Sequence, residues 1–298
     1  MIKVLMHRCF VAAALMAAVT VSCSKAYAED RKEKPHEEPA AAPEWMEVPV
    51  LDRGPYYHFF THYMTDGEQT QRNYSFYWSE NDKVSFWVAY PMNAGLMGVG
   101  RRPNPQPWAK DPLLEKAGLE QPDVSLKFKG YTRGHQIASA DRYLWDSNAQ
   151  TYYSSNMTPQ LYDVNGFIWV TLEQKVRDWS RRCDTLYVVS GCVIENSTEA
   201  TLCGDVEATV PTAYWKALLR YNSARTSGYG GYSGCGVFVW HKGHSQSDVI
   251  SSRDAMPLSA LEKKVGIKLF PLLDSVLGKK LAAKVKDEDP RREDFWGW

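Results

Sequence analysis

The hydrophobic residues of the chain fall mainly into short runs that are rich in aromatic and β-branched side chains and are separated by polar turns. Runs of this kind are typical of β-strands, and Ser79–Asp82 between two of them has the composition of a hairpin turn. The hairpin favours an antiparallel sheet. The predicted strands are His58–Met64, Arg72–Trp78, Val84–Tyr90, Val124–Lys129, Thr185–Ile194, Ala213–Tyr221 and Cys235–His241.

The segment Asp163–Cys183 has the apolar period of a helix instead. At about 100° per residue, its apolar side chains share an arc of about 100°, which is a core-facing stripe; they are Ile168, Trp169, Leu172, Val176 and Trp179. Shorter helices are predicted at Leu113–Ala117 and after Pro257. The pattern predicts an α+β fold with a mostly antiparallel central sheet flanked by helices.

The N-terminus has the features of an export signal. Lys3 and Arg8 precede the apolar run Phe10–Val21, and Ala26-Tyr27-Ala28 is a small-x-small cleavage site that ends the predicted signal at residue 28. A loose lipobox offers a second cut, before Cys23, which would leave a lipid anchor. Both cuts predict an exported protein that is periplasmic, extracellular or lipid-anchored at the outer surface, with this anchor as its one membrane contact.

The rest of the chain divides by composition. Residues 29–44 are charged, rich in proline and alanine and without an apolar period, so we expect a disordered tether. The folded domain is predicted over residues 45–277, and residues 278–298 are expected to form a charged C-terminal tail.

Composition and charge narrow the classes of protein. The 298 residues include 44% hydrophobic and 23% charged residues, values of ordinary globular proteins, which excludes wholesale disorder. The 35 basic and 35 acidic residues exclude a histone-like polycation. Loss of residues 1–28 removes three of the 35 basic residues and leaves 32 against 35 acidic ones, a net charge of −3.

Four cysteines remain after the signal, and an exported chain can join them in two disulfides. Cys183 and Cys192 flank a predicted strand about 30 Å long, too far apart to pair. Cys192 and Cys203 lie symmetrically about a polar turn, as cross-strand partners do. We therefore expect the pairs Cys192–Cys203 and Cys183–Cys235.

Residues able to carry chemistry recur at defined spacing. Arg133-Gly134-His135 is followed after twenty residues by Asn156-Met157-Thr158-Pro159-Gln160, then by Asn165, Glu173 and Arg177. Each element alone is ordinary: a turn with a surface histidine, a polar residue at a helix start, an exposed i,i+4 ion pair. Together they place an amide oxygen, a carboxylate and a guanidinium beside one helix.

The pattern RGH, twenty residues, N-x-x-P-Q-x-x-x-x-N, seven residues, E-x-x-x-R resembles that of the DNA/RNA non-specific endonuclease family, the ββα-metal nucleases. Weaker similarity extends over most of the chain from His58 to Leu277. The resemblance implies a ββα-metal active site and a metal-dependent endonuclease that contacts DNA and RNA through backbone phosphates and leaves 5′-phosphate ends.

The resemblance also implies a role for each matching residue. His135 would be the general base, suited by an ordinary pKa of about 6.5. Mg²⁺, with Mn²⁺ as a substitute, would bind one side-chain oxygen and several waters. The remaining roles are Asn165 as the metal ligand, Glu173 as the carboxylate that orients water of the metal, Arg133 and Arg177 as phosphate donors, and Asn156 as the residue that orients the backbone or His135.

Two points stay open in the sequence. A further family arginine corresponds to Arg101 or Arg102, and we favour Arg102 for substrate binding. Many family members have Asp where this chain has Thr132, which keeps hydrogen bonding but not charge. Two alternatives follow: a phosphodiesterase of the same fold acting on another diester, or a nucleic-acid-binding surface protein with weakened catalysis.

Overall fold

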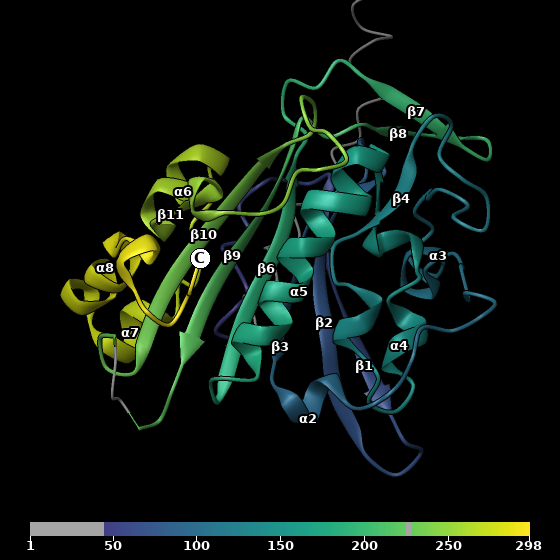
Figure 1. Cartoon of the computed structure of the whole chain (residues 1–298). Coiled ribbons are helices and arrows are strands. Elements are labelled where there is room, and N and C mark those ends of the chain that lie inside the picture. The colour runs from purple at the N-terminus through teal and green to yellow at the C-terminus, as the bar shows by residue number, and fades with distance from the viewer. Residues whose placement is uncertain (1–44, 225–227) are drawn as a thin grey trace, which may run out of the picture. The chain divides into compact units, whose positions relative to one another are not determined.

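The computed structural model describes residues 45–224 and 228–298 (Figure 1). The predicted export signal and the predicted tether, residues 1–44, lie outside the described residues. Within them, no helix is both long and apolar enough to cross a bilayer. A seven-stranded antiparallel sheet in the order β1-β2-β3-β6-β9-β10-β11 forms the centre. Its strands are β1 (Tyr57–Thr65), β2 (Thr70–Ser79), β3 (Val84–Met92), β6 (Thr185–Val193), β9 (Ala213–Tyr221), β10 (Tyr232–Trp240) and β11 (Ala255–Met256).

Six of the seven predicted runs are confirmed as strands of this sheet. The seventh, Val124–Lys129, is wrong, because the chain turns there: Asp123 accepts hydrogen bonds from the backbone N–H and the hydroxyl of Ser125. The Val124 carbonyl is also engaged by an arginine side chain rather than by a neighbouring strand. Two small two-stranded antiparallel sheets are also formed, by β4 (Thr132–His135) with β5 (Met157–Gln160) and by β7 (Ala200–Cys203) with β8 (Val206–Thr209).

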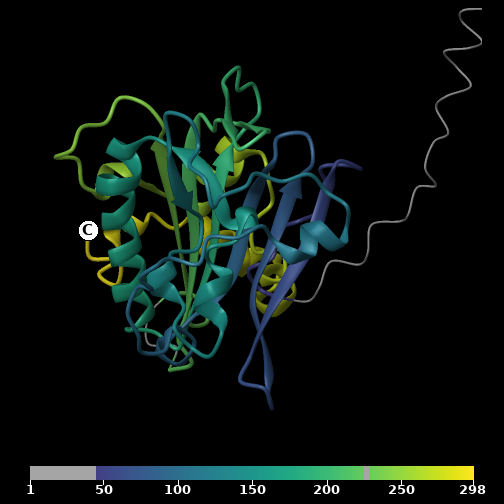
Figure 2. The ribbon, with the colours of Figure 1, turned by 90° about the vertical axis from the view of Figure 1, so that its right-hand side faces the viewer.

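Helices cover both faces of the sheet. The α-helices are α2 (Ala94–Met97), α3 (Pro112–Lys116), α4 (Ser147–Gln150), α5 (Trp169–Ser180), α6 (Leu258–Val265), α7 (Leu273–Leu277) and α8 (Lys279–Asp287). In β10, Gly234 and Gly236 face Leu258 and Leu261 of α6. The alternate residue Ser233 accepts a hydrogen bond from Trp296, which packs against α5 on the other face. Figure 2 shows α5 and the C-terminal helices separated by the sheet.

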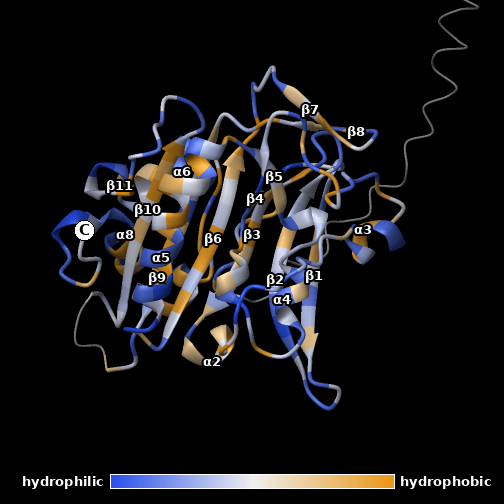
Figure 3. Ribbon diagram, turned by 45° about the vertical axis from the view of Figure 1, so that its right-hand side comes forward, coloured by the Kyte–Doolittle hydropathy of each residue, from blue (hydrophilic) through white to orange (hydrophobic). Residues whose placement is uncertain are grey.

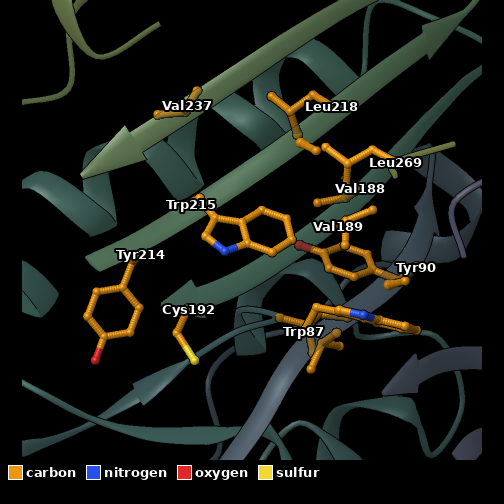
Figure 4. Packing of buried hydrophobic residues seen from close by; sticks show 14 of the residues in the cluster. Trp87, Tyr90, Val188, Val189, Cys192, Tyr214, Trp215, Leu218, Val237 and Leu269 are labelled. Carbon is orange, nitrogen blue, oxygen red and sulfur yellow. The ribbon is translucent and has the colours of Figure 1, made fainter. Parts of the chain in front are cut away.

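The predicted stripe of α5 is confirmed, since all five of its apolar residues are buried. Apolar positions concentrate along β6, as Figure 3 shows. The core is strongly aromatic on both faces of the sheet. Tyr90, whose hydroxyl donates to Asp141, faces α5, whereas Trp87 and Trp215 point to the other face because side chains alternate along a strand (Figure 4). Gly191 of β6 pairs with Trp215 of β9, and a Cβ at Gly191 would lie 2.2 Å from the indole. Glycine is therefore required opposite this tryptophan.

The folded region extends past the predicted boundary at Leu277. Ala282 and Val285 of α8 are buried, and so is Lys286, whose Nζ donates to Glu262 and to the Leu269 carbonyl. Trp296 is fully buried, with its ring 5.2 Å from that of Trp179, whose Nε1 donates a hydrogen bond to the Trp296 carbonyl. Residues 278–298 are part of the fold and not a free tail.

The predicted disulfides are wrong, because all four cysteines of the described region are free thiols. Both edges of β6 are already paired, with β3 and β9, so the strand that carries Cys203 cannot lie beside Cys192. Instead the Cys192 thiol faces the Ser85 carbonyl at 3.5 Å, and the Cys203 thiol faces that of Asp123 at 3.1 Å. The position of two cysteines on either side of a turn does not show which strands are neighbours in the sheet.

The thiols give a direct chemical prediction. When the protein is unfolded in the absence of reductant and treated with iodoacetamide, we expect peptide mass mapping to find Cys183, Cys192, Cys203 and Cys235 all alkylated. Prior reduction should leave the map unchanged. Alkylation of any of the four only after reduction would contradict the structure.

Candidate active site

The site is built on a ββα unit. The antiparallel pair of β4 and β5 places Arg133 opposite Pro159 and His135 opposite Met157, so the two sequence motifs are directly paired (Figure 3). After β5 the chain makes a turn of π-helix, Val164–Ile168, and continues as α5. The order strand, strand, helix confirms the expected ββα arrangement. Because side chains alternate along a strand, Arg133 and His135 share one face of β4.

Asn156 holds the backbone that follows His135. Its side-chain oxygen accepts a hydrogen bond from the Ile137 N–H at 2.9 Å, and its Nδ2 donates to the carbonyls of Ile137 at 2.9 Å and Thr151 at 2.7 Å. The residue is fully buried. The structure thus places the Asn156 side chain on backbone groups next to His135, and its role in orienting the site stays a prediction.

Gly134 has a steric role. A Cβ at this position would lie 2.5 Å from Oε1 of Gln160, the last residue of the Asn156–Gln160 motif. The close approach explains why glycine separates the arginine from the histidine.

His135 lies between two aromatic rings. Its ring centroid is 5.5 Å from Trp108 and 5.3 Å from Tyr152, and its carbonyl accepts a hydrogen bond from Trp169 Nε1 at 3.3 Å. The ring is partly exposed, but its Nε2 is buried and has no hydrogen-bond partner among the described residues. Burial first, and then the positive charges of Arg102 and Arg133, lower the pKa of His135 to about 3. The imidazole is therefore uncharged at neutral pH, with a nitrogen free to accept a proton.

Arg133 is held in place from two sides. Its guanidinium stacks on Trp108, 3.7 Å from the ring centroid, and its Nη1 donates to the Val124 carbonyl at 2.7 Å. Arg102 is exposed, and its charge reaches both His135 and Glu173. Sequence reasoning missed Trp108, which contacts Arg133 and His135 together; its place in a proline-rich loop gave no periodic signal.

Asn165 has the orientation required of an oxygen ligand. Its Nδ2 donates to Thr132 Oγ1 at 2.9 Å and lies 3.4 Å from the Arg133 carbonyl, and the Thr132 hydroxyl in turn donates to the Gln160 carbonyl at 2.6 Å. The amide oxygen has no partner within the described part of the protein. Thr132 thus fixes the Asn165 amide through its hydroxyl, without a carboxylate.

Glu173 and Arg177 lie on α5 with different surroundings. Arg177 forms an ion pair with Asp141, Nη1 to Oδ1 3.0 Å, and the other oxygen of this buried carboxylate accepts a hydrogen bond from Tyr90 at 3.1 Å. Glu173 has no ion pair or hydrogen bond to a described residue. Burial, and then the charge of Asp141, raise the pKa of Glu173 to about 7. Asp141 was missed because its partner is 36 residues away in the sequence.

The donor set fits a hard divalent cation. No group of three or more His, Cys, Asp or Glu side chains with metal-binding geometry occurs in the described ranges. The amide oxygen of Asn165 and the carboxylate of Glu173, on one continuous helical segment and both without a hydrogen-bond partner among the described residues, are oxygen donors of the kind that a hard divalent cation accepts together with several waters.

The ββα unit beside a large antiparallel sheet is the architecture of the ββα-metal nucleases. Over 75% of this chain and 87% of the other, the fold matches the crystal structure of the EndoG/EndoGI complex with a TM-score of 0.56 and 20% identity. Residues 56–275 match the model of the DNA/RNA non-specific endonuclease family, and the chain belongs to that family.

Curated relatives of the chain are nucleases. The nuclease of Serratia marcescens is 31% identical over 159 residues, 50% of this chain and 57% of that protein. Mitochondrial nuclease EXOG of Xenopus laevis is 31% identical over 51% of this chain and 44% of that protein, and human mitochondrial endonuclease G is 26% identical over 50% and 51%. The chain spans about half the length of these relatives.

The three hydrogen bonds of the Asn156 side chain give a stability prediction. Asn156→Ala would leave the buried N–H of Ile137 and two carbonyls without their partners, and an unsatisfied buried group costs about 1–3 kcal/mol. We expect the free energy of unfolding in urea to fall by at least about 2 kcal/mol. Asn81→Ala, at an exposed turn, is the matched control and should change little. Equal free energies of unfolding for the two variants would show that the Asn156 hydrogen bonds do not stabilise the fold.

Proposed function

We propose that the protein is an exported, Mg²⁺-dependent, non-specific endonuclease that hydrolyses phosphodiester bonds of DNA and RNA and leaves 5′-phosphate ends. The observation that carries the proposal is the pair of unpartnered acceptors at β4. Nε2 of His135 belongs to β4, and the amide of Asn165 is held through its Nδ2 by Thr132 of the same strand, which leaves Oδ1 without a partner among the described residues. A proton acceptor and an oxygen ligand for a cation, both fixed by β4, are what phosphodiester hydrolysis by water requires.

The residues divide the reaction between them. His135 Nε2 accepts the proton of the attacking water. A bound divalent cation supplies positive charge to the phosphate and the leaving oxygen. Asn165 Oδ1 would hold this ion, and Glu173 accepts a hydrogen bond from water in the site. An incoming phosphate counters the charges of Arg102 and Arg133, two causes of the low pKa of His135, and so strengthens the base when substrate is bound.

Substrate contacts are expected at phosphates. Arg133 has guanidinium N–H groups beyond the one bound to Val124, and Arg102 is exposed beside it. Arg177 donates to Asp141 through Nη1 and contributes its other N–H groups. Phosphate contacts carry no sequence information, which supports cleavage without base specificity on both DNA and RNA.

Export rests on the sequence of residues 1–28 alone. A signal that ends at Ala28 releases the protein to the periplasm or the medium, whereas a cut before Cys23 anchors it by lipid. Of the alternatives, decayed catalysis is disfavoured by Thr132, because its hydroxyl still orients the Asn165 amide.

Plasmid nicking tests the proposal directly. Wild-type protein with Mg²⁺ should convert supercoiled plasmid to nicked and linear forms and degrade RNA, and EDTA should abolish both. His135→Ala should lower the rate by about 10²–10⁴, the usual contribution of general-base catalysis. His58→Ala, a histidine paired with Glu80 outside the site, is the matched control and should retain activity. Unchanged nicking by His135→Ala would remove the assigned base.

The Thr132 contact gives a second kinetic prediction. Thr132→Val keeps the shape but removes the hydroxyl that accepts from Asn165, so the amide is free to rotate. We expect the Mg²⁺ concentration for half-maximal activity to rise by about tenfold, a change of about 1.4 kcal/mol and the usual size of one hydrogen bond. Thr132→Ser should restore the wild-type value. If Val and Ser variants have the same Mg²⁺ dependence, the hydroxyl does not position Asn165.

A further inference from the structure

Lys216 is a buried cation directly behind the site. It lies in the middle of β9, is 1% exposed and points to the face of the sheet that α5 covers. A lysine is almost never fully buried unless its charge is compensated and its N–H groups are satisfied. The sheet could accommodate an apolar side chain here, as at most neighbouring positions of β9. The contacts of the ammonium group therefore indicate its role.

The ammonium group binds the backbone of the site. Nζ donates to the Gln136 carbonyl at 2.9 Å and to Ser190 Oγ of β6 at 2.9 Å. Gln136 directly follows His135. Nζ also lies 4.8 Å from the ring centroid of Trp169, whose Nε1 holds the His135 carbonyl. Lys216 thus connects the two central strands to the segment and the helix that fix the general base.

Lys216 also completes a balance of buried charges. Asp141 and Glu173 are the carboxylates near it, and Arg177 is the other cation. Arg177 is committed to Asp141 by the 3.0 Å ion pair. Burial raises the pKa of Glu173 to about 7 and lowers that of Lys216 to about 8. Lys216 and Glu173 do not form an ion pair, yet the charge of each opposes the pKa shift of the other. The charge of Glu173 is therefore compensated across the site, which leaves its oxygens unoccupied by protein donors.

We propose that Lys216 is a positioning residue of the active site, which fixes the backbone carrying His135 and compensates the charge of Glu173 without occupying its oxygens. Its effect on rate rests on the proposed nuclease function. A direct ion pair would hold the Glu173 carboxylate away from water, and an apolar residue would leave a buried charge uncompensated. A lysine that donates to two neutral acceptors supplies the compensating charge without forming an ion pair with Glu173.

A double-mutant cycle tests the coupling. The variants are Lys216→Met, Glu173→Gln and the two combined, measured for kcat and KM on plasmid or a defined oligonucleotide with Mg²⁺. Lys216→Met should lower kcat by about tenfold or more with KM within about twofold, and should lower it much less in the Glu173→Gln background, because contacting residues are not additive. Lys216→Arg, which keeps the charge, should recover part of kcat. Lys264→Met, an exposed lysine of α6, is the control and should match wild type.

Equal fold-losses in the two backgrounds would overturn the proposal, since a purely structural lysine acts independently of Glu173. Urea unfolding of the same variants gives a readout that needs no catalysis. Lys216→Met should be less stable than the double variant, because removing one of two compensating charges costs more than removing both. If Lys216→Met does not fold, Lys216→Gln replaces it in both cycles.

The two hypotheses fail in different ways. A wild-type protein without phosphodiesterase activity refutes the proposed function, and the unfolding cycle alone then decides whether Lys216 and Glu173 are coupled. An active wild type with additive variants leaves the nuclease assignment intact and refutes the role of Lys216.

Discussion

The pairing of β4 with β5 is the interaction on which the site depends. It sets Arg133 and His135 on one face of a strand, where both contact Trp108, and it brings Gln160 against Gly134. An isolated pair of strands with four residues each has only marginal stability. It is held here by side chains from elsewhere: Asn156 clasps the backbone after His135, and α5 contributes the Trp169 hydrogen bond. A few buried polar contacts thus fix the site residues of β4 to the core of the protein.

Much of the fold was predictable because its signals are local. Alternating aromatic runs located six strands, and the stripe of α5 was found from its period alone. The candidate residues were found by spacing, and the structure gathers His135, Arg133 and Asn165 at β4, with Glu173 and Arg177 on the adjacent helix. Asn156 hydrogen-bonds to the backbone beside them.

The failures concern features that local sequence does not contain. Val124–Lys129 has a strand-like composition, but the chain turns at both ends of it, and only Lys129 makes a backbone–backbone hydrogen bond to a described strand, β7. The proposed disulfides assumed that cysteines flanking a turn lie on neighbouring strands, whereas β6 was already paired on both sides. The charged C-terminal segment folds because Trp296 enters a pocket beside Trp179. Asp141 and Lys216 have partners 36 and 80 residues away, so that only the folded chain reveals them.

Charge explains how a protein of zero net formal charge can present a positive surface to phosphate. Behind the site, Asp141 and Glu173 are balanced by Arg177 and Lys216, so the buried layer contributes little net field. In front of it, Arg102 and Arg133 have no ion pair with an acidic residue in the described chain, and both act on His135 strongly enough to lower its pKa. Association with a polyanion depends on where cations sit rather than on their sum. The two arginines that add to the effect of burial in lowering the pKa of His135 are, in the proposed function, those that an incoming phosphate meets first, which links substrate binding to the basicity of the residue that accepts the proton.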